Sequence, residues 1–443
     1  MYIPNDIKIL SKIEQNHDVL SIFQYKDTTA WISIKNLITT SLYDDDIRIN
    51  NSNKNNIFSL KGIKTILNSL KYYLFLIFDK KEKDIFLGAS TGLFAHKNQT
   101  KDAYFPYDSV DHKSTIYMLN CTSLDELIKY DKYIKKYHIV IENYLLVIVK
   151  KLFTKLFSLI LSKKKKLEIR NFNTILKIEN INISDKHLIR RYMEFSIGYR
   201  LYQVFFRLLN IKTAYIVSAP TKSDMLAALK SLNIKTIEIQ HGIVGRLHRG
   251  YNFTLSKNNI LPTVDKINVY NQFWKDEIIK AGYFKEEQIN IVGRLKYDIV
   301  EKNIEKLNFK YIVFTGQGAF FNQIIKFFKD ADKLLSENKI KMFYKAHPRE
   351  FKSEKDAFKK SINDLKSCNF YEDIYTTEEL IKNSIAHISV FSSCHFDAVY
   401  YKEKTYILDI MENNIMNFYV NSAADKFIKI NTIKDLIKNE TFN

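Results

Sequence analysis

The most restrictive feature of the sequence is a regular alternation of strand-like and helix-like segments from residue 211 to residue 410. The strand-like segments are short, rich in β-branched and aromatic residues, and lie at 211–220, 234–240, 266–271, 289–293, 310–318, 339–348, 386–393 and 405–410. Amphipathic helical patterns lie between most of them. Such alternation is typical of α/β proteins with parallel sheets. The sequence therefore predicts an α/β fold of two Rossmann-like domains facing a central cleft.

The domain boundaries follow from an interruption at 299–309, which lacks apolar periodicity and is interpreted as a linker. We place an N-terminal domain at 1–300, whose first 200 residues carry a weaker pattern, and a C-terminal domain at 306–430. In the weaker region, residues 29–35 form an apolar strand-like run, and residues 58–78 look helical.

Composition limits the compartment and the partners. The three cysteines are far apart and form no CxxC pair, so a disulfide framework is not expected and a reducing compartment fits. No secretory signal is visible, and the most apolar stretch, 139–161, contains Glu142 and three lysines, so we expect a cytoplasmic protein without a spanning helix. The net charge of +19 suits nucleic acid, an anionic membrane or phosphate-bearing small molecules. No nucleic-acid-binding motif is present, so nucleic acid is not an expected partner.

Four lysines, Lys163 to Lys166, follow an apolar helical pattern at 147–162. This segment has two interpretations. The apolar face and the basic end could rest peripherally on the anionic inner membrane. Alternatively, a buried helix ends there in a solvated lysine-rich loop, because cations favour a helix C-terminus.

Polar residues follow three of the predicted strands, which is where α/β folds place their ligands. After the first of these, Glu238 and His241 are candidate general bases, since both can take a proton from an attacking hydroxyl. In the loop behind them, Arg246, His248 and Arg249 could hold phosphate. A plain strand-end turn with a solvated basic loop is the alternative.

The other two strand ends lie in the C-terminal series. Lys345, His347, Pro348 and Arg349 form a turn that Pro348 fixes, and its cations could neutralise a nucleotide phosphate. Ser392 and Ser393 precede a helix, where hydroxyls and free backbone N–H groups bind anions. Simple strand termination and simple helix capping are the alternatives.

These segments resemble a known family when read in order. The motifs of the series, in chain order, are QHG with GRLHRGY, VGRLKYD, FTGQG, KAHPRE and SVFSSCHFDAVYYKEKTYIL. The series resembles bacterial GT-B transferases of capsular and surface polysaccharide assembly. The HP and SS segments are similar to those of bacterial sialyltransferases. The HG, HP and SS…FD series is similar to CDP-glycerol glycerophosphotransferases. The D/E-D/E-G motif of the sialyltransferases is replaced here by Glu238-Ile239-Gln240-His241-Gly242.

The resemblance implies a metal-independent glycosyltransferase, with no cofactor, that moves a sugar from a nucleotide-activated donor, CMP-sugar favoured, to a growing bacterial surface glycan. It implies a saccharide or lipid-linked acceptor, an acceptor-side N-terminal domain and a donor-binding C-terminal domain. The implied donor site comprises Gly316, Gln317, Gly318, Lys345, His347, Pro348, Arg349, Ser392 and Ser393.

In the implied mechanism, an acceptor hydroxyl attacks the anomeric carbon with His241 or Glu238 as base. Arg246, Arg249 and Arg294 would be cations that stabilise the departing phosphate, with His248 beside them. The DxD-like run Asp44 to Asp46 is interpreted as a surface turn and not a metal site. The alternatives are a CDP-polyol phosphotransferase of teichoic-acid type, which attacks phosphorus, and a non-catalytic binding protein.

Overall fold

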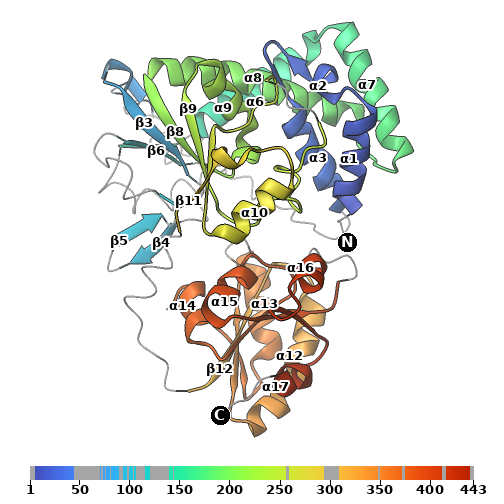
Figure 1. Cartoon of the computed structure of the whole chain (residues 1–443), viewed down its shortest axis with the longest axis vertical. Coiled ribbons are helices and arrows are strands. Elements are labelled where there is room, and N and C mark those ends of the chain that lie inside the picture. The colour runs from blue at the N-terminus through green and yellow to red at the C-terminus, as the bar shows by residue number, and fades with distance from the viewer. Residues whose placement is uncertain are drawn as a thin grey trace. The chain divides into compact units, whose positions relative to one another are not determined.

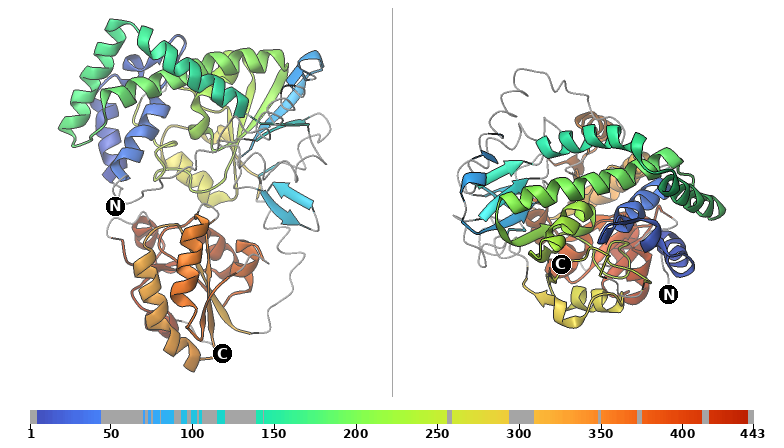
Figure 2. Two further views of the ribbon diagram at one scale, coloured as in Figure 1. Left: turned by 180° about the vertical axis from the view of Figure 1, so that it is seen from behind. Right: turned by 90° about the horizontal axis from the view of Figure 1, so that it is seen from above.

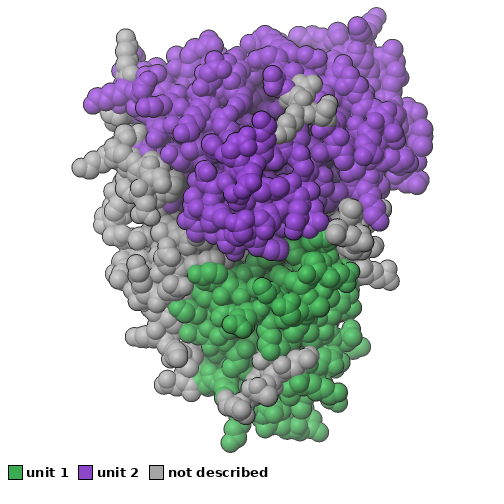
Figure 3. Space-filling view, viewed as in Figure 1, with its two compact units in different colours: residues 1–4, 295–443 green, residues 5–294 purple. Residues whose placement is uncertain are grey.

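The structure is a computed structural model that describes residues 5–43, 70, 73–74, 76–79, 81–88, 93–96, 99–102, 104–105, 115–119, 139–142, 144–255, 259–293, 309–347, 350–371, 375–411 and 416–439. The chain divides into two compact units (Figure 3), one of residues 5–294 and the other of residues 1–4 and 295–443. Each unit has its own sheet and is described separately below.

The first unit is built on a seven-stranded sheet whose described strand pairs are all parallel (Figure 1). Its order is β11-β10-β9-β8-β3-β6-β7. In chain order the strands are β3 (Lys83–Leu87), β6 (Thr115–Leu119), β7 (Ile139–Glu142), β8 (Ile211–Val217), β9 (Lys235–Ile239), β10 (Lys266–Val269) and β11 (Ile289–Ile291). β8 is buried at six of its seven positions, as expected for a strand covered on both faces.

The elements around this sheet include helices and two small antiparallel strand pairs. The pairs are β1 (Gln24–Tyr25) with β2 (Thr28–Thr29), and β4 (Leu93–His96) with β5 (Gln99–Asp102). The helices are α1 (Asn5–Asn16), α2 (Val19–Ile22), α3 (Trp31–Tyr43), α6 (Tyr144–Ile160), α7 (Lys163–Ile178), α8 (Asp185–Leu208), η2 (Ala219–Lys222), α9 (Ser223–Ser231), α10 (Gln272–Lys280) and η3 (Glu286–Gln288).

The prediction of a strand at 29–35 is wrong, because α3 begins at Trp31 and runs to Tyr43. Trp31, Ile34 and Ile38 are fully buried at helical spacing. A short apolar run does not distinguish a buried strand from a buried helix, and Lys35, which ends this run, is also buried. The predicted helix at 58–78 lies mostly outside the described residues.

The interpretation of the four lysines as a solvated loop after a helix is wrong. α6 ends at Ile160, and the lysines form the first turn of α7, which begins at Lys163. The Oγ of Ser162 accepts a hydrogen bond from the Lys165 backbone N–H, so this serine is the N-cap. The cap therefore overrides the unfavourable placement of cations at a helix N-terminus.

The second unit has a six-stranded parallel sheet of order β14-β13-β12-β15-β16-β17. Its strands are β12 (Tyr311–Thr315), β13 (Lys341–Lys345), β14 (Cys368–Phe370), β15 (Ala386–Ser389), β16 (Thr405–Leu408) and β17 (Phe427–Ile430). Its helices are α12 (Phe321–Glu337), α13 (Lys352–Ile362), α14 (Thr377–Asn383), α15 (Cys394–Lys402), α16 (Asn417–Ser422) and α17 (Ile433–Asn439). Phe314, Phe328 and Tyr344 centre a core between this sheet and its helices.

Both sheets are doubly wound, which confirms the prediction of two Rossmann-like α/β domains. In each sheet the first strand has the second strand on one side and the fourth on the other: β3 lies between β6 and β8, and β12 lies between β13 and β15. Ligands of open α/β sheets bind outside the carboxyl ends of the strands at such a reversal of strand order. The reversal lies between β3 and β8 in the first sheet and between β12 and β15 in the second, and the loops after β9 and β13 follow the strands next to it.

None of the described helices is long and apolar enough to cross a bilayer.

Candidate active site

Glu238 is buried at the carboxyl end of β9, where its carboxylate joins three segments. Its Oε1 accepts hydrogen bonds from the Ala219 N–H at 2.8 Å and from the Tyr251 hydroxyl at 2.6 Å. Burial raises the pKa of Glu238 to about 7, against the two hydrogen bonds and Lys222, which lower it. The carboxyl group thus holds the turn after β8 and the loop at Tyr251 to the end of β9.

His241 follows Glu238 in a turn that Gln240 fixes. The Gln240 side chain donates to the Gly242 carbonyl at 2.8 Å and accepts from the Tyr270 N–H at 2.9 Å. The imidazole of His241 is half-buried, and its ring meets Tyr104 edge-on with 6.4 Å between ring centroids. His241 is therefore held at the sheet edge yet remains partly open to solvent.

The basic loop behind His241 is locked to the first unit by Arg246. Its guanidinium forms a two-pronged ion pair with the buried Glu277 of α10, at 2.7 and 3.2 Å. A Cβ added at Gly245, where φ is +98°, would lie 2.7 Å from the backbone of Glu277, so only glycine allows this approach. The structure thus places Arg246 against α10, although the sequence suggested a phosphate ligand.

His248 and Arg249 lie nearer to His241. The Nδ1 of His248 accepts the Gly250 N–H at 3.1 Å, which fixes the tautomer with its proton on Nε2. Burial, together with the charges of Arg249, His241 and Lys35, lowers the pKa of His248 to about 3. The imidazole of His248 is therefore neutral at physiological pH. Its Nε2 N–H can donate a hydrogen bond, but the ring cannot act as a cation.

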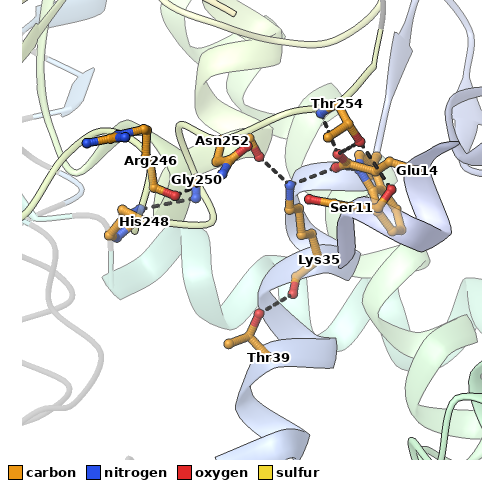
Figure 4. Close-up of polar contacts among 10 residues, drawn as sticks. Ser11, Glu14, Lys35, Thr39, Arg246, His248, Gly250, Asn252 and Thr254 are labelled. Atoms are coloured by element: carbon orange, nitrogen blue, oxygen red, sulfur yellow. Dashed lines mark hydrogen bonds and ion pairs between the residues drawn. The ribbon is translucent and has the colours of Figure 1, made fainter. Parts of the chain in front are cut away.

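A buried ion pair anchors the same loop to the N-terminal helices (Figure 4). The Nζ of Lys35 lies 2.7 Å from both Glu14 Oε1 and the Asn252 carbonyl. Glu14 also accepts from the Trp31 indole and, through Oε2, from the Thr254 N–H. Helices α1 and α3 therefore fix the loop that carries His248 and Arg249.

Replacing Glu238 by glutamine should remove a pH dependence of stability. The folded state keeps a proton on Glu238 up to about pH 7, whereas its ordinary pKa is 4.5. Between these values the folded state binds more protons than the unfolded state, so the free energy of unfolding falls as pH rises. The variant lacks this loss. Its stability relative to the wild type should therefore rise by on the order of 3 kcal/mol between about pH 5 and about pH 8.

The measurement is urea unfolding followed by tryptophan fluorescence, because Trp31 and Trp274 are the two tryptophans of the chain and both lie in the first unit. The matched control is Glu286→Gln, whose side chain is 71% exposed and which should show no such trend. A Glu238→Gln difference that does not change with pH would contradict this description of the carboxyl group.

In the second unit, Glu350 organises the loops at the strand ends. Its Oε1 accepts from the His347 N–H at 2.7 Å and from the Tyr344 hydroxyl at 3.1 Å, and the carboxylate also accepts the Gly318 N–H. Burial raises the pKa of Glu350. A Cβ at Gly316 would lie 2.2 Å from the Tyr344 hydroxyl, so the glycine is required there. One buried carboxyl group therefore ties the turn after β12 to the turn after β13.

The turn after β12 leads into α12, whose N-terminus has no side-chain cap. Gln317 and Gly318 are partly exposed, and Gly318 has a φ of +71°. Phe320 is the N-cap of α12, and a phenylalanine side chain has no acceptor for the first N–H groups of the helix. Such N–H groups, with the helix dipole behind them, favour a phosphate.

The remaining donor-site candidates of this unit differ in their surroundings. Lys345 is buried, and its Nζ donates a hydrogen bond of 3.2 Å to the Tyr375 carbonyl. The same Nζ lies over the ring of Tyr371, 5.4 Å from its centroid. The Oγ of Ser392 accepts the Cys394 N–H at 3.1 Å, whereas Ser393 is exposed. The ends of β13, β12 and β15 are adjacent in the sheet, so the structure brings His347, Gly318 and Ser393 to one edge.

Beneath this edge, two buried histidines connect three strands to α15. His387 contacts Thr315 at 2.9 Å and Thr405 at 2.8 Å, and His395 contacts Thr405 at 2.7 Å. Burial lowers the pKa of His395 to about 3 and lowers the pKa of His387 well below its ordinary value. The network is therefore neutral, and it fixes β12, β15 and β16 where the strand order reverses.

Several predicted residues cannot be placed. Arg294, Pro348, Arg349 and the run Asp44 to Asp46 lie outside the described residues. Among the described residues, no three His, Cys, Asp or Glu side chains gather as metal ligands do.

Sequence analysis missed Glu350, Tyr251, Glu14 and Lys35 as residues that shape these edges. Glu350 could have been noticed as an acidic residue directly after the HP turn. The Lys35–Asn252 contact joins positions 217 apart, and nothing in the sequence indicates it.

No protein-family model matches the chain, and no curated protein matches it significantly. Solved structures with a similar fold include UDP-GlcNAc 2-epimerase from Methanocaldococcus jannaschii, at 11% identity and a TM-score of 0.45, covering 82% of this chain and 94% of that one. The enzyme of the same name from Neisseria meningitidis has 8% identity, a TM-score of 0.46, and coverages of 81% and 92%. A variant of the wall teichoic acid polymerase TagF has 13% identity, a TM-score of 0.41, and coverages of 86% and 88%. Similarities of this size assign no activity to the chain, whose fold rests on its own strand orders.

Proposed function

We propose that the protein is a transferase that uses a nucleotide-activated sugar as donor. The second unit binds the nucleotide part, and the first unit supplies the base that activates an acceptor hydroxyl. The acceptor is a saccharide or a lipid-linked glycan of a bacterial surface polymer, as the sequence resemblance implies.

The observation that carries this proposal is the edge of the second sheet. The reversal of strand order between β12 and β15, the Gly316–Gly318 turn and the uncapped end of α12 coincide there. Each feature favours a phosphate group, and together they form the usual dinucleotide- and nucleotide-binding arrangement of doubly wound sheets. His347 and Ser393, at the neighbouring strand ends, are the side chains we assign to the donor.

Of the two candidate bases, we assign His241. A general base must come within hydrogen-bond distance of the hydroxyl it deprotonates. Glu238 has only 1% of its surface exposed, and its Oε1 already accepts hydrogen bonds from Ala219 and Tyr251. His241 is half-buried at the same edge. We therefore assign Glu238 to holding the loops in place and His241 to proton transfer.

In the proposed reaction, His241 takes the hydroxyl proton as the acceptor oxygen forms a bond to the anomeric carbon. The bond between that carbon and the nucleotide phosphate oxygen breaks, and the nucleotide leaves with the bonding pair. The N–H groups at the start of α12 stabilise the negative charge on the departing phosphate.

Donor binding is tested by thermal shift of the full chain with CMP, CDP, UDP and GDP, with and without EDTA. A nucleotide at about 100 times its Kd stabilises a protein by about 2.7 kcal/mol, so the melting temperature should rise by several degrees. The resemblance to sialyltransferases and glycerophosphotransferases predicts that CMP or CDP gives the larger shift. EDTA should leave it unchanged.

The variant for this test is His347→Ala, and the matched control is His187→Ala on the exposed surface of α8. We expect the shift to disappear in the first variant and to persist in the second. No shift with any nucleotide, or an unchanged shift in His347→Ala, would overturn the assignment of the donor site.

A further inference from the structure

Helix α6 leaves a wide apolar face uncovered. Leu152, Phe153, Leu156, Phe157 and Ile160 are between 41% and 72% exposed. Their spacing places them on one side of the helix, and the rings of Phe153 and Phe157 lie 5.8 Å apart between centroids. Contiguous apolar surface of this kind in a soluble protein marks an interaction site. Seen from behind, α6 runs along the outside of its unit next to α7 (Figure 2).

An adjacent side of α6, which carries Lys150 and Thr154, attaches the helix to the unit. Thr154 is buried, and the Nζ of Lys150 lies 2.8 Å from Asp224 of α9. The exposed face therefore belongs to a helix with a fixed orientation.

The charged residues of α6 and of the first turn of α7 are all lysines. Residues 144–167 contain seven lysines and no aspartate or glutamate. Lys151 and Lys155 border the apolar face, and Lys163 and Lys164 follow it at the start of α7; all four are exposed. The helix cap at Ser162 holds these last two lysines close to the end of α6.

We propose that α6 and the first turn of α7 form a docking surface for an anionic lipid bilayer. Exposed leucines and phenylalanines enter the boundary between headgroups and acyl chains, and flanking lysines contact the lipid phosphates. A second copy of the chain would bring two lysine-rich faces together, which like-charge repulsion opposes. The combination of apolar insertion and a polybasic patch supplies the two signals that stable peripheral binding requires.

The test is co-sedimentation of the full chain with vesicles of phosphatidylcholine alone or with about 30 mol% phosphatidylglycerol. We expect binding to the anionic vesicles only, weakened by salt. Leu156→Glu with Phe157→Glu should weaken it roughly 100-fold or more, because both side chains must leave water. Lys163→Gln with Lys164→Gln should weaken it roughly fivefold per lysine.

The matched controls lie elsewhere on the same unit. Ile291→Glu with Val292→Glu replaces side chains that are 47% and 56% exposed, and Lys212→Gln with Lys285→Gln replaces lysines that are 69% and 61% exposed. Both should bind like the wild type. Equal binding to neutral and anionic vesicles, no binding to either, or full binding by the α6 variant would overturn the proposal. So would a wild-type dimer in analytical ultracentrifugation that the α6 variant makes monomeric.

Discussion

Replacing His241 by alanine should lower kcat by about 10²- to 10⁴-fold, which is the usual contribution of general acid–base catalysis. Nucleotide binding should not change, because we assign the donor site to the other unit. The measurement is the rate of nucleotide release from the donor that gives the largest thermal shift, with acceptor present. The pH profile of the wild type should lose its ascending limb in the variant.

Two further variants separate proton transfer from structural damage. His187→Ala should keep the wild-type kcat. Glu238→Gln should retain more activity than His241→Ala, since we assign this carboxyl group to loop positioning and its amide can still accept the Ala219 N–H. A wild-type kcat in His241→Ala, or a larger loss in Glu238→Gln, would show that the base is not His241.

The second large effect is expected at Lys35. Lys35→Met leaves the buried Glu14 without its cation and should lower the free energy of unfolding of the first unit by about 3–5 kcal/mol. The double variant Glu14→Gln with Lys35→Met should recover part of this loss, because no uncompensated charge remains. The measurement is urea unfolding by tryptophan fluorescence.

The control is Lys212→Met, which removes an ion pair with Glu82. The Lys212 side chain is 69% exposed and the Glu82 side chain 68%. Pairs of this kind contribute about 0–1 kcal/mol. Equal losses for Lys35→Met and Lys212→Met would contradict the view that the buried pair anchors the basic loop.

Much of the fold could be predicted from local pattern. Eight of the thirteen described strands of the two sheets were predicted, as short apolar runs that end in Gly or polar residues, and these runs indicated two doubly wound domains. The other five, β3, β6, β7, β14 and β17, were not predicted. Two predictions failed for the same physical reason. Lys35 is buried against Glu14 of another helix, and Ser162 starts a helix where the lysines suggested a solvated loop. In both places a specific contact outweighed the average behaviour of the residue type.

The candidate site was predictable only as a set of strand ends. Because the carboxyl ends of parallel strands share one edge within each sheet, the order of elements predicted that His241 lies at such an edge of the first sheet and that His347 and Ser393 lie at such an edge of the second. The residues whose contacts hold these positions in place could not be predicted from the order of elements. Glu238 meets Tyr251, and Arg246 meets Glu277, through contacts set by tertiary packing. Arg246, predicted as a phosphate ligand, is consequently placed in an ion pair with α10.

Hydrogen–deuterium exchange of the full chain, with and without its best nucleotide, tests the central claim most directly. We predict slower exchange at 316–322, 346–347 and 391–394 when nucleotide is bound. The first unit also contains a cavity of about 430 Å³ lined by Asp27, Lys230 and Asp265. Protection confined to that cavity, or no protection at the three loops of the second unit, would contradict the claim that the donor binds where β12, β13 and β15 end.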